Sequence, residues 1–431
     1  MFHKDKFSLS TIIDFSYMFF STLIKKGFGF IREIILAFFF GSSVIYANYL
    51  LLKTASDFIS QITIGNALQA NIMPKFVKLY SKYKILNLNN VYNFSKSFSL
   101  KLFLLIQIIQ IPIILYLNPP NILLYIIISI LLGFISSLNF FNAIFMTILQ
   151  AKGDFKKFSI ATTFNISLST FLLYPLIFMF KIIASFTSIL GVVVSRLIGV
   201  LSLTVLYVKP LFNEKGKNNI NLSIIDFNIS VLILGNFANI IMILGRFVSG
   251  LDGGNNITFY TYAVVILNIF FTSVVMNINT LVLKFISVHK NIRVLVYSTL
   301  FTALIGGCFI YFILFFSEEL IAFVFQRGNF IKSDTLATSS YLKDLSWSFI
   351  LIFISSSLFQ SYFTLPQDYL QKNTHKLVWP LFFTIIFLFC FFLINDYTAK
   401  LNSIIMIYSL SFLSFLTAIF AFIKYLKYES S

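Results

Sequence analysis

Long apolar runs recur along the whole chain, and short polar segments separate them. A helix that crosses a hydrocarbon core about 30 Å thick needs about 20 mostly apolar residues. By this measure the sequence predicts about twelve membrane-spanning helices. They lie near residues 9–39, 44–74, 95–117, 122–149, 158–180, 183–208, 226–250, 256–285, 293–317, 337–364, 376–395 and 398–425. We therefore predict an all-α polytopic membrane protein.

The overall composition supports the same fold class. The chain has 431 residues, of which 58% are hydrophobic and 11% are charged, and its mean hydropathy is +0.90. Ordinary soluble domains are about 45–50% apolar and about 25% charged. Because a water-soluble globule of this size could not bury so much apolar surface, the composition excludes a soluble protein.

Cationic residues gather in every second connecting segment. With a cytoplasmic N-terminus, the inside segments hold the Lys and Arg residues near 75–101, 152–157, 209–217, 284–293, 372–376 and 424–427. The outside connections hold few cations, and one of them contains Glu318 and Glu319. This alternation follows the positive-inside rule and predicts that both termini are cytoplasmic. The net charge of +17 is then a consequence of topology, and we expect no nucleic-acid partner.

Residues that could bind a metal or catalyse a reaction are sparse. The histidines, His3, His289 and His375, have no His, Cys or carboxylate at metal-ligand spacing. Cys308 and Cys390 both lie inside apolar runs, so they predict neither a disulfide framework nor a metal site. Glycine-rich phosphate loops and the Gly-x-Ser-x-Gly motif are absent from the sequence. We expect no cofactor, no metal and no enzyme activity.

Charged residues inside predicted spans are the strongest candidates for function, because each costs at least about 2.5–3.5 kcal/mol to insert at the membrane centre. Lys26 and Arg32 lie six residues apart in the first predicted helix, about 9 Å along its axis. They are candidate ligands for an anionic substrate. The alternative is structural: Lys25 and Lys26 extend to the interface, and Arg32 pairs with Glu33 or with a neighbouring helix.

Three further charged residues belong to the second and seventh predicted helices. Lys53 and Asp57 share a helix face at i, i+4 spacing. They form either a self-neutralising pair or a site where Asp57 binds a coupling cation or a proton. Arg246 lies near the outer end of its helix. It either extends to the interface or contacts the substrate.

The two halves of the chain show a weak internal correspondence. In each half an arginine, Arg32 or Arg246, precedes a glycine-containing outer turn and an aromatic-rich start of the next helix. Six helices are predicted in each half. This arrangement predicts two six-helix lobes, residues 1–215 and 216–431, around a central cavity.

Four segments of the chain carry a resemblance to a known family. The first runs from Gly-Phe-Ile-Arg-Glu at 29–33 through Phe-Gly-Ser at 40–42 to Ile-Met-Pro at 72–74, and the others are 149–154, 245–263 and 325–335. The last reads Phe-Gln-Arg-Gly-Asn-Phe before Ser-Asp-Thr and is the most specific. In consistent order along the chain, they resemble the MurJ-type lipid II flippase family.

The resemblance implies a two-lobe exporter fold of the multidrug/oligosaccharidyl-lipid/polysaccharide type. Such a protein would move a polyprenyl-pyrophosphate-linked cell-wall precursor, lipid II first, from the inner to the outer leaflet of the bacterial cytoplasmic membrane by alternating access. Arg32 matches the family directly, and Lys26 stands where these flippases often have Arg. By this resemblance both face the cavity and attract the pyrophosphate. The expected partners are the lipid-linked oligosaccharide, membrane lipids and cell-wall synthesis proteins, and the expected state is a monomer.

The chain departs from the family pattern at several cavity positions. The family's acidic residue after the Phe-Gly turn falls near Ala47 or Asn48, and a cationic cavity residue falls near Ser60. The Asp-Arg that follows the family's Tyr-Ala pair is Val264-Val265 here. Two alternatives therefore stay open. One is a flippase for an O-antigen, capsular or teichoic lipid-linked oligosaccharide, and the other is a multidrug exporter of the same fold.

Overall fold

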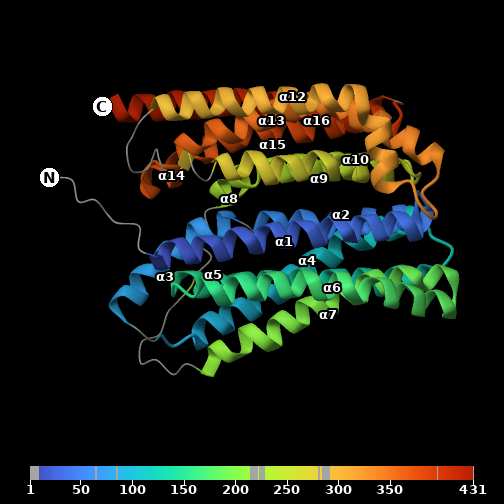
Figure 1. Ribbon diagram of the computed structural model, residues 1–431, viewed down its shortest axis with the longest axis horizontal. Coiled ribbons are helices and arrows are strands. Elements are labelled where there is room, and N and C mark those ends of the chain that lie inside the picture. The colour runs from blue at the N-terminus through green and yellow to red at the C-terminus, as the bar shows by residue number, and fades with distance from the viewer. Residues whose placement is uncertain are drawn as a thin grey trace. The chain divides into compact units, whose positions relative to one another are not determined.

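The computed structural model describes residues 9–63, 66–83, 86–213, 222, 229–279, 282–283, 292–395 and 397–430. Apart from a single bridge residue at Asn87, the secondary structure in these ranges is helical (Figure 1). Nine helical segments of the described residues are long and apolar enough to cross a membrane. The predicted all-α membrane fold is confirmed to this extent, whereas the count of twelve spans and the central cavity stay predictions.

Helix packing divides the chain into two compact units. Unit 1 comprises Met1–Ile35 and Thr63–Phe227, and unit 2 comprises Leu36–Ile62 and Asn228–Ser431. The lobe boundary predicted near residue 215 stays a prediction. Within the packing units, the segment Leu36–Ile62 comes early in the sequence but belongs to the second unit.

Unit 1 is built around one central helix. It contains most of α1 (Leu9–Phe40), together with α3 (Asn66–Lys82), α4 (Asn89–Leu117), α5 (Ile122–Ala151), α6 (Phe155–Ile183) and α7 (Ser188–Leu203). Helix α5 packs against α3, α4, α6 and α7 (Figure 1). Its uncharged and mostly apolar sequence suits this position, because a helix covered on several sides needs no charged face.

Small residues let α6 and α7 approach each other closely. A Cβ atom at Gly199 would lie 2.7 Å from the carbonyl oxygen of Asn165, and one at Gly191 would lie 2.6 Å from the Cα atom of Ile177. Contacts this short exclude a larger side chain at either glycine. Glycine at a helix interface is a common way to bring two membrane helices together.

Unit 2 has two central helices. It contains α2 (Val44–Thr63) up to Ile62, and α8 (Ile229–Gly235), α9 (Phe237–Ser249), α10 (Asn256–Phe270), α12 (Ile292–Phe325), α13 (Lys332–Phe363), α14 (Gln367–Asn373), α15 (His375–Ile394) and α16 (Ala399–Ser430). Helix α13 packs against α10, α12 and α16, and α16 also packs against α9 and α15. The core of this unit therefore lies between α13 and α16.

Two predicted spans differ in detail from the observed helices. The span predicted over 226–250 is divided into α8 and α9 at Asn236. The span predicted over 44–74 contains α2 and α3, and residues 64 and 65 between them lie outside the described residues. Helix α12 continues beyond its predicted end to Phe325, with a non-helical backbone at Phe316 (φ −116°, ψ 19°). Apolar runs predicted these helices, but a single broken turn inside a run leaves no hydrophobic signal.

Two glycine turns meet at one end of unit 2. Gly41 (φ +50°) and Gly328 (φ +59°) both adopt the left-handed conformation that glycine tolerates best. The backbone N–H of Asn329 donates to the carbonyl oxygen of Phe38 (2.9 Å). A Cβ at Gly41 would collide with the Asn329 carbonyl oxygen, and one at Gly328 would collide with the Phe38 carbonyl oxygen. Glycine is therefore required on both sides of this contact.

Polar and aromatic contacts also join the segments that carry these two glycine turns. The Ser42 hydroxyl donates to the Asp334 carboxylate (2.8 Å), whose other oxygen accepts from the backbone N–H of Ile331 (3.1 Å). The Tyr262 ring lies 5.3 Å from the ring of Phe330. Two segments that carry the family resemblance, 40–42 and 325–335, thus contact each other within unit 2.

Candidate functional site

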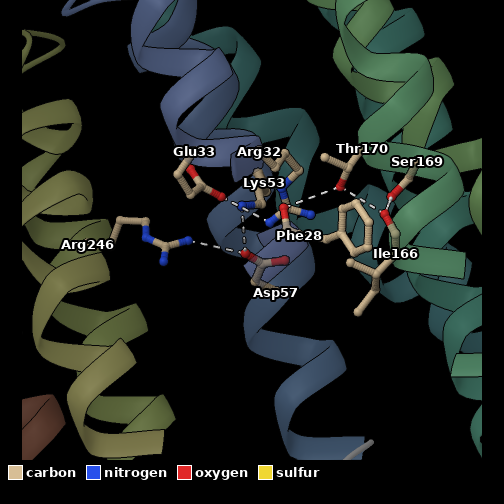
Figure 2. A network of polar contacts seen from close by, with 9 residues as sticks. All are labelled: Phe28, Arg32, Glu33, Lys53, Asp57, Ile166, Ser169, Thr170 and Arg246. Atoms are coloured by element: carbon tan, nitrogen blue, oxygen red, sulfur yellow. Dashed lines mark hydrogen bonds and ion pairs between the residues drawn. The ribbon is translucent and has the colours of Figure 1, made fainter. Parts of the chain in front are cut away.

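The candidate charged residues of unit 1 lie on α1. Arg32 and Glu33 form an ion pair, with 3.0 Å between Nη2 and Oε1 (Figure 2). The Arg32 side chain is 24% exposed and the Glu33 side chain 10%. The structure therefore contains the Arg32–Glu33 ion pair that we considered as a structural role for Arg32. Its proposed contact with substrate stays a prediction.

The two lysines that precede Arg32 are held differently. The Lys25 ammonium donates to the Thr162 hydroxyl (3.3 Å) and lies 5.8 Å from the centre of the Phe158 ring. Lys26 is half-buried and has no hydrogen bond or ion pair with any other residue that the structure describes. Of the two adjacent cations, Lys26 is thus the one available to an added ligand.

A hydrogen bond between α6 and the backbone of α1 helps to position these cations. The Thr170 hydroxyl contacts the carbonyl oxygens of Phe28 (3.4 Å) and Ile166 (2.8 Å), as Figure 2 shows. Phe28 also packs edge-on against the Phe171 ring, with 5.3 Å between centroids. Helix α6 therefore holds α1 one turn before Arg32.

The candidate charged residues of unit 2 meet at one carboxylate, that of Asp57. Asp57 Oδ2 lies 3.2 Å from Nη1 of Arg246 and 3.7 Å from Nζ of Lys53 (Figure 2). The exposed fractions of the side chains are 24% for Asp57, 14% for Arg246 and 13% for Lys53. The structure thus brings together three of the residues singled out from the sequence.

Local structure and helix packing each supply part of this cluster. Lys53 and Asp57 are one turn apart on α2, which places both on the same helix face. Arg246 lies in the last turn of α9. A second contact joins the same two helices, because the Asn239 amide donates to the Gln61 side-chain oxygen (3.4 Å). Helices α2 and α9 therefore meet at two polar contacts.

The unit 2 cluster leaves one donor of Arg246 unused. The Arg246 guanidinium has five donors, and its Nε is buried without a hydrogen-bond partner among the described residues. A phosphate or pyrophosphate oxygen would satisfy this donor. No set of metal-ligating side chains occurs in the described part of the chain.

The Asp57–Arg246 contact is the feature that the sequence did not predict. The two residues are 189 positions apart, so no helical spacing connects them. The only signal was the weak correspondence between the two halves, which singled out Arg246 without naming its partner. The candidate residues lie in two groups, Lys26 and Arg32 in unit 1 and Lys53, Asp57 and Arg246 in unit 2.

Comparison with solved structures identifies the fold. The chain matches a lipid II flippase MurJ in an inward closed conformation with a TM-score of 0.69 at 18% identity, over 93% of this chain and 86% of the other. It matches an inward-facing multidrug resistance MATE family transporter of the MOP superfamily with a TM-score of 0.58 at 15% identity, over 99% and 96%. A MATE structure in the straight conformation gives 0.58 at 15% identity, over 96% and 94%.

Neither the protein-family models nor the curated protein sequences contain a match to this chain. At 15–18% identity the structural likeness concerns the fold alone. The chain therefore has a fold similar to that of these solved structures, in agreement with the fold that the four sequence segments implied. Fold alone does not identify a substrate.

Proposed function

We propose that this protein is a transporter, not an enzyme, and that it works by alternating access. Its cargo is a polyprenyl-pyrophosphate-linked cell-wall precursor, with lipid II as the first choice, moved from the inner to the outer leaflet of the bacterial cytoplasmic membrane. It acts as a monomer with both termini in the cytoplasm. Lipid-linked sugar enzymes of the membrane would supply the cargo, and cell-wall synthesis proteins would consume it.

Two cations with unused donors, one in each unit, carry the proposal. Among the described residues, the Nε of Arg246 is buried without a hydrogen-bond partner, and Lys26 has no paired anion. A pyrophosphate is compact and doubly anionic, and Arg binds it through paired donors. Lys26, Arg32 and Arg246 are the proposed substrate contacts.

The cationic candidate residues support the lipid-linked cargo over a drug. An exporter of cationic drugs would need anionic side chains for its cargo, and cations would repel it. A flippase for an O-antigen, capsular or teichoic carrier lipid fits the same charges, since these share the polyprenyl pyrophosphate.

The proposed role of Lys53 and Asp57 is coupling of transport to an ion. Protonation of Asp57, or a cation bound to it, would weaken its contacts with Lys53 and Arg246. Arg246 would then be released toward the pyrophosphate. Asp57→Asn removes this control while keeping the side-chain shape, so we expect transport that no longer responds to a proton gradient.

Complementation tests the proposal. Bacteria depleted of their own lipid II flippase would express the full chain, and an impermeant reagent would measure lipid II in the outer leaflet. We expect outer-leaflet lipid II to return, and to be lost again with Arg32→Gln. Lys101→Gln is the matched control, because Lys101 is an exposed cation on α4 outside the candidate site.

The outcomes separate the alternatives. If lipid II exposure stays absent although the chain is present in the membrane, lipid II is not the cargo. The same purified protein in vesicles would then be tested with O-antigen, capsular and teichoic carrier lipids. Transport of a cationic dye, but of none of these lipids, would replace the proposal with multidrug export.

A further inference from the structure

A groove in unit 1 lies apart from the candidate substrate residues. It has a volume of about 800 Å³ and runs between α4, α5 and the segment after α7. Its lining comprises Asn89, Tyr92, Lys96, Ser99, Leu100, Phe103, Phe134, Ser137, Leu138, Phe141, Thr204, Val205, Lys209 and Phe212. We infer that this groove binds one glycerophospholipid, with its phosphate at Lys96 and Lys209 and an acyl chain along the aromatic wall.

The shape of the groove suits a single lipid chain. Its lining on α4 begins at Asn89 and ends at Phe103, which spans about 21 Å at 1.5 Å per residue. One leaflet of hydrocarbon is about 15 Å deep, half of a core about 30 Å thick. An acyl chain and its headgroup therefore fill the length, whereas a polyprenyl carrier would extend well beyond it.

The two lysines of the groove lie at its predicted cytoplasmic end. Lys96 is exposed near the start of α4, and Lys209 is exposed directly after α7 and its π-helical turn. No carboxylate occurs among the described residues that line the groove. Tyr92 lies at the same end and packs edge-on against Phe212, with 4.9 Å between centroids. Two cations and a tyrosine are typical of a phosphate site at a membrane interface.

Two buried hydroxyls favour a lipid that carries ester groups. Ser99 is 9% exposed and Ser137 is 5% exposed, and both residues line the groove. Neither hydroxyl has a hydrogen-bond partner among the described residues. Ester carbonyls lie just below the phosphate of a glycerophospholipid, as Ser99 lies one turn beyond Lys96. These carbonyl oxygens would accept hydrogen bonds from the two serine hydroxyls. A polyprenyl chain has no carbonyl group that could do so.

The backbone on one side of the groove is unusual. Thr204–Val208 forms a π-helical turn that contributes Thr204 and Val205 to the lining. The Thr204 hydroxyl donates to the Asn142 side-chain oxygen (3.0 Å), and the Asn142 amide donates to the Val200 carbonyl (3.3 Å). Single π-helical turns are frequent at functional sites. Here the turn directs Val205 into the groove while Thr204 stays bonded to α5.

Photolabelling of the full chain tests this inference. The protein would be placed in phosphatidylcholine nanodiscs that contain phosphatidylglycerol with a photoreactive acyl chain, and labelled peptides would be mapped. We expect labels within 89–103 and 134–141. The double variant K96Q/K209Q should lower labelling by roughly fivefold for each lysine, the equivalent of about 1 kcal/mol each. The control K101Q removes a cation from the same helix outside the groove and should leave labelling unchanged.

Further variants and competitors decide between possible occupants. Leu138→Trp fills the groove without changing its charge and should also lower labelling, which keeps the test valid if the double variant does not fold. Unlabelled phosphatidylglycerol should compete. Labels outside the groove, equal labelling of K96Q/K209Q, or stronger competition by undecaprenyl phosphate than by phosphatidylglycerol would overturn the inference. The site is independent of the cargo, so its failure would leave the transport proposal unchanged.

Discussion

The charges of unit 1 and those of unit 2 are paired in different ways. Arg32 bonds to Glu33, its neighbour in the sequence, whereas Asp57 bonds to Arg246 across 189 positions. Helix positions i and i+1 do not face each other, so the first pair depends on flexible side chains and forms within a single helix. The second pair forms only when α2 and α9 are packed together. We therefore expect the unit 2 charges to stabilise the fold and Arg32 to be the more available for a ligand.

The largest expected effect is that of Asp57→Ala. Removing this carboxylate leaves Arg246 and Lys53 without the anion that they share, in a place where both are mostly buried. The free energy of unfolding should fall by about 3 kcal/mol, as for other broken buried pairs. The measurement is the Tm of the purified protein in detergent. Asp368→Ala, an exposed carboxylate in α14, is the control, and equal Tm values for the two variants would contradict the structural role.

Two double-mutant cycles compare the pairs directly. For Asp57→Ala with Arg246→Ala we expect a coupling energy of about 1–3 kcal/mol, because each residue contacts the other across helices. For Arg32→Ala with Glu33→Ala we expect less than about 1 kcal/mol, because Arg32 is partly exposed and the pair is local. Unfolding in detergent gives all the required values. Equal coupling energies in the two cycles would contradict the expected difference in strength between the unit 1 pair and the unit 2 pair.

Arg32→Gln should reduce transport more than stability. Outer-leaflet lipid II should fall at least tenfold, a loss of about 1.4 kcal/mol of interaction, with a Tm close to that of the unaltered chain. Arg32→Lys should restore part of the activity, since it keeps the charge but not the paired donors. A parallel loss of Tm and transport would instead assign Arg32 to the fold.

The smallest expected effect is that of Lys53→Gln. Its ammonium lies 3.7 Å from Asp57, farther than the guanidinium of Arg246 at 3.2 Å. Pairs at i, i+4 stabilise a helix by about 0.3–0.5 kcal/mol, so Tm should change little. A loss as large as that of Asp57→Ala would show that Lys53, not Arg246, is the main partner of the carboxylate.

Much of the fold could be predicted from local patterns. Apolar runs of about 20 residues predict membrane helices because the bilayer forces each backbone to satisfy its own hydrogen bonds. Periodicity cannot show where a helix breaks inside such a run, as at Asn236 between α8 and α9. It also cannot assign Leu36–Ile62 to a packing unit. That assignment depends on contacts between distant segments.

For the candidate site, the sequence by itself determined which charges are unusual and which lie on one helix face. Lys53 and Asp57 could be paired from their spacing, because a helix places i and i+4 side by side. Tertiary structure alone decided that Arg246 joins them and that Gly41 contacts Asn329. The physical reason is that helix geometry acts over a few residues, whereas contacts between helices depend on which apolar faces pack together.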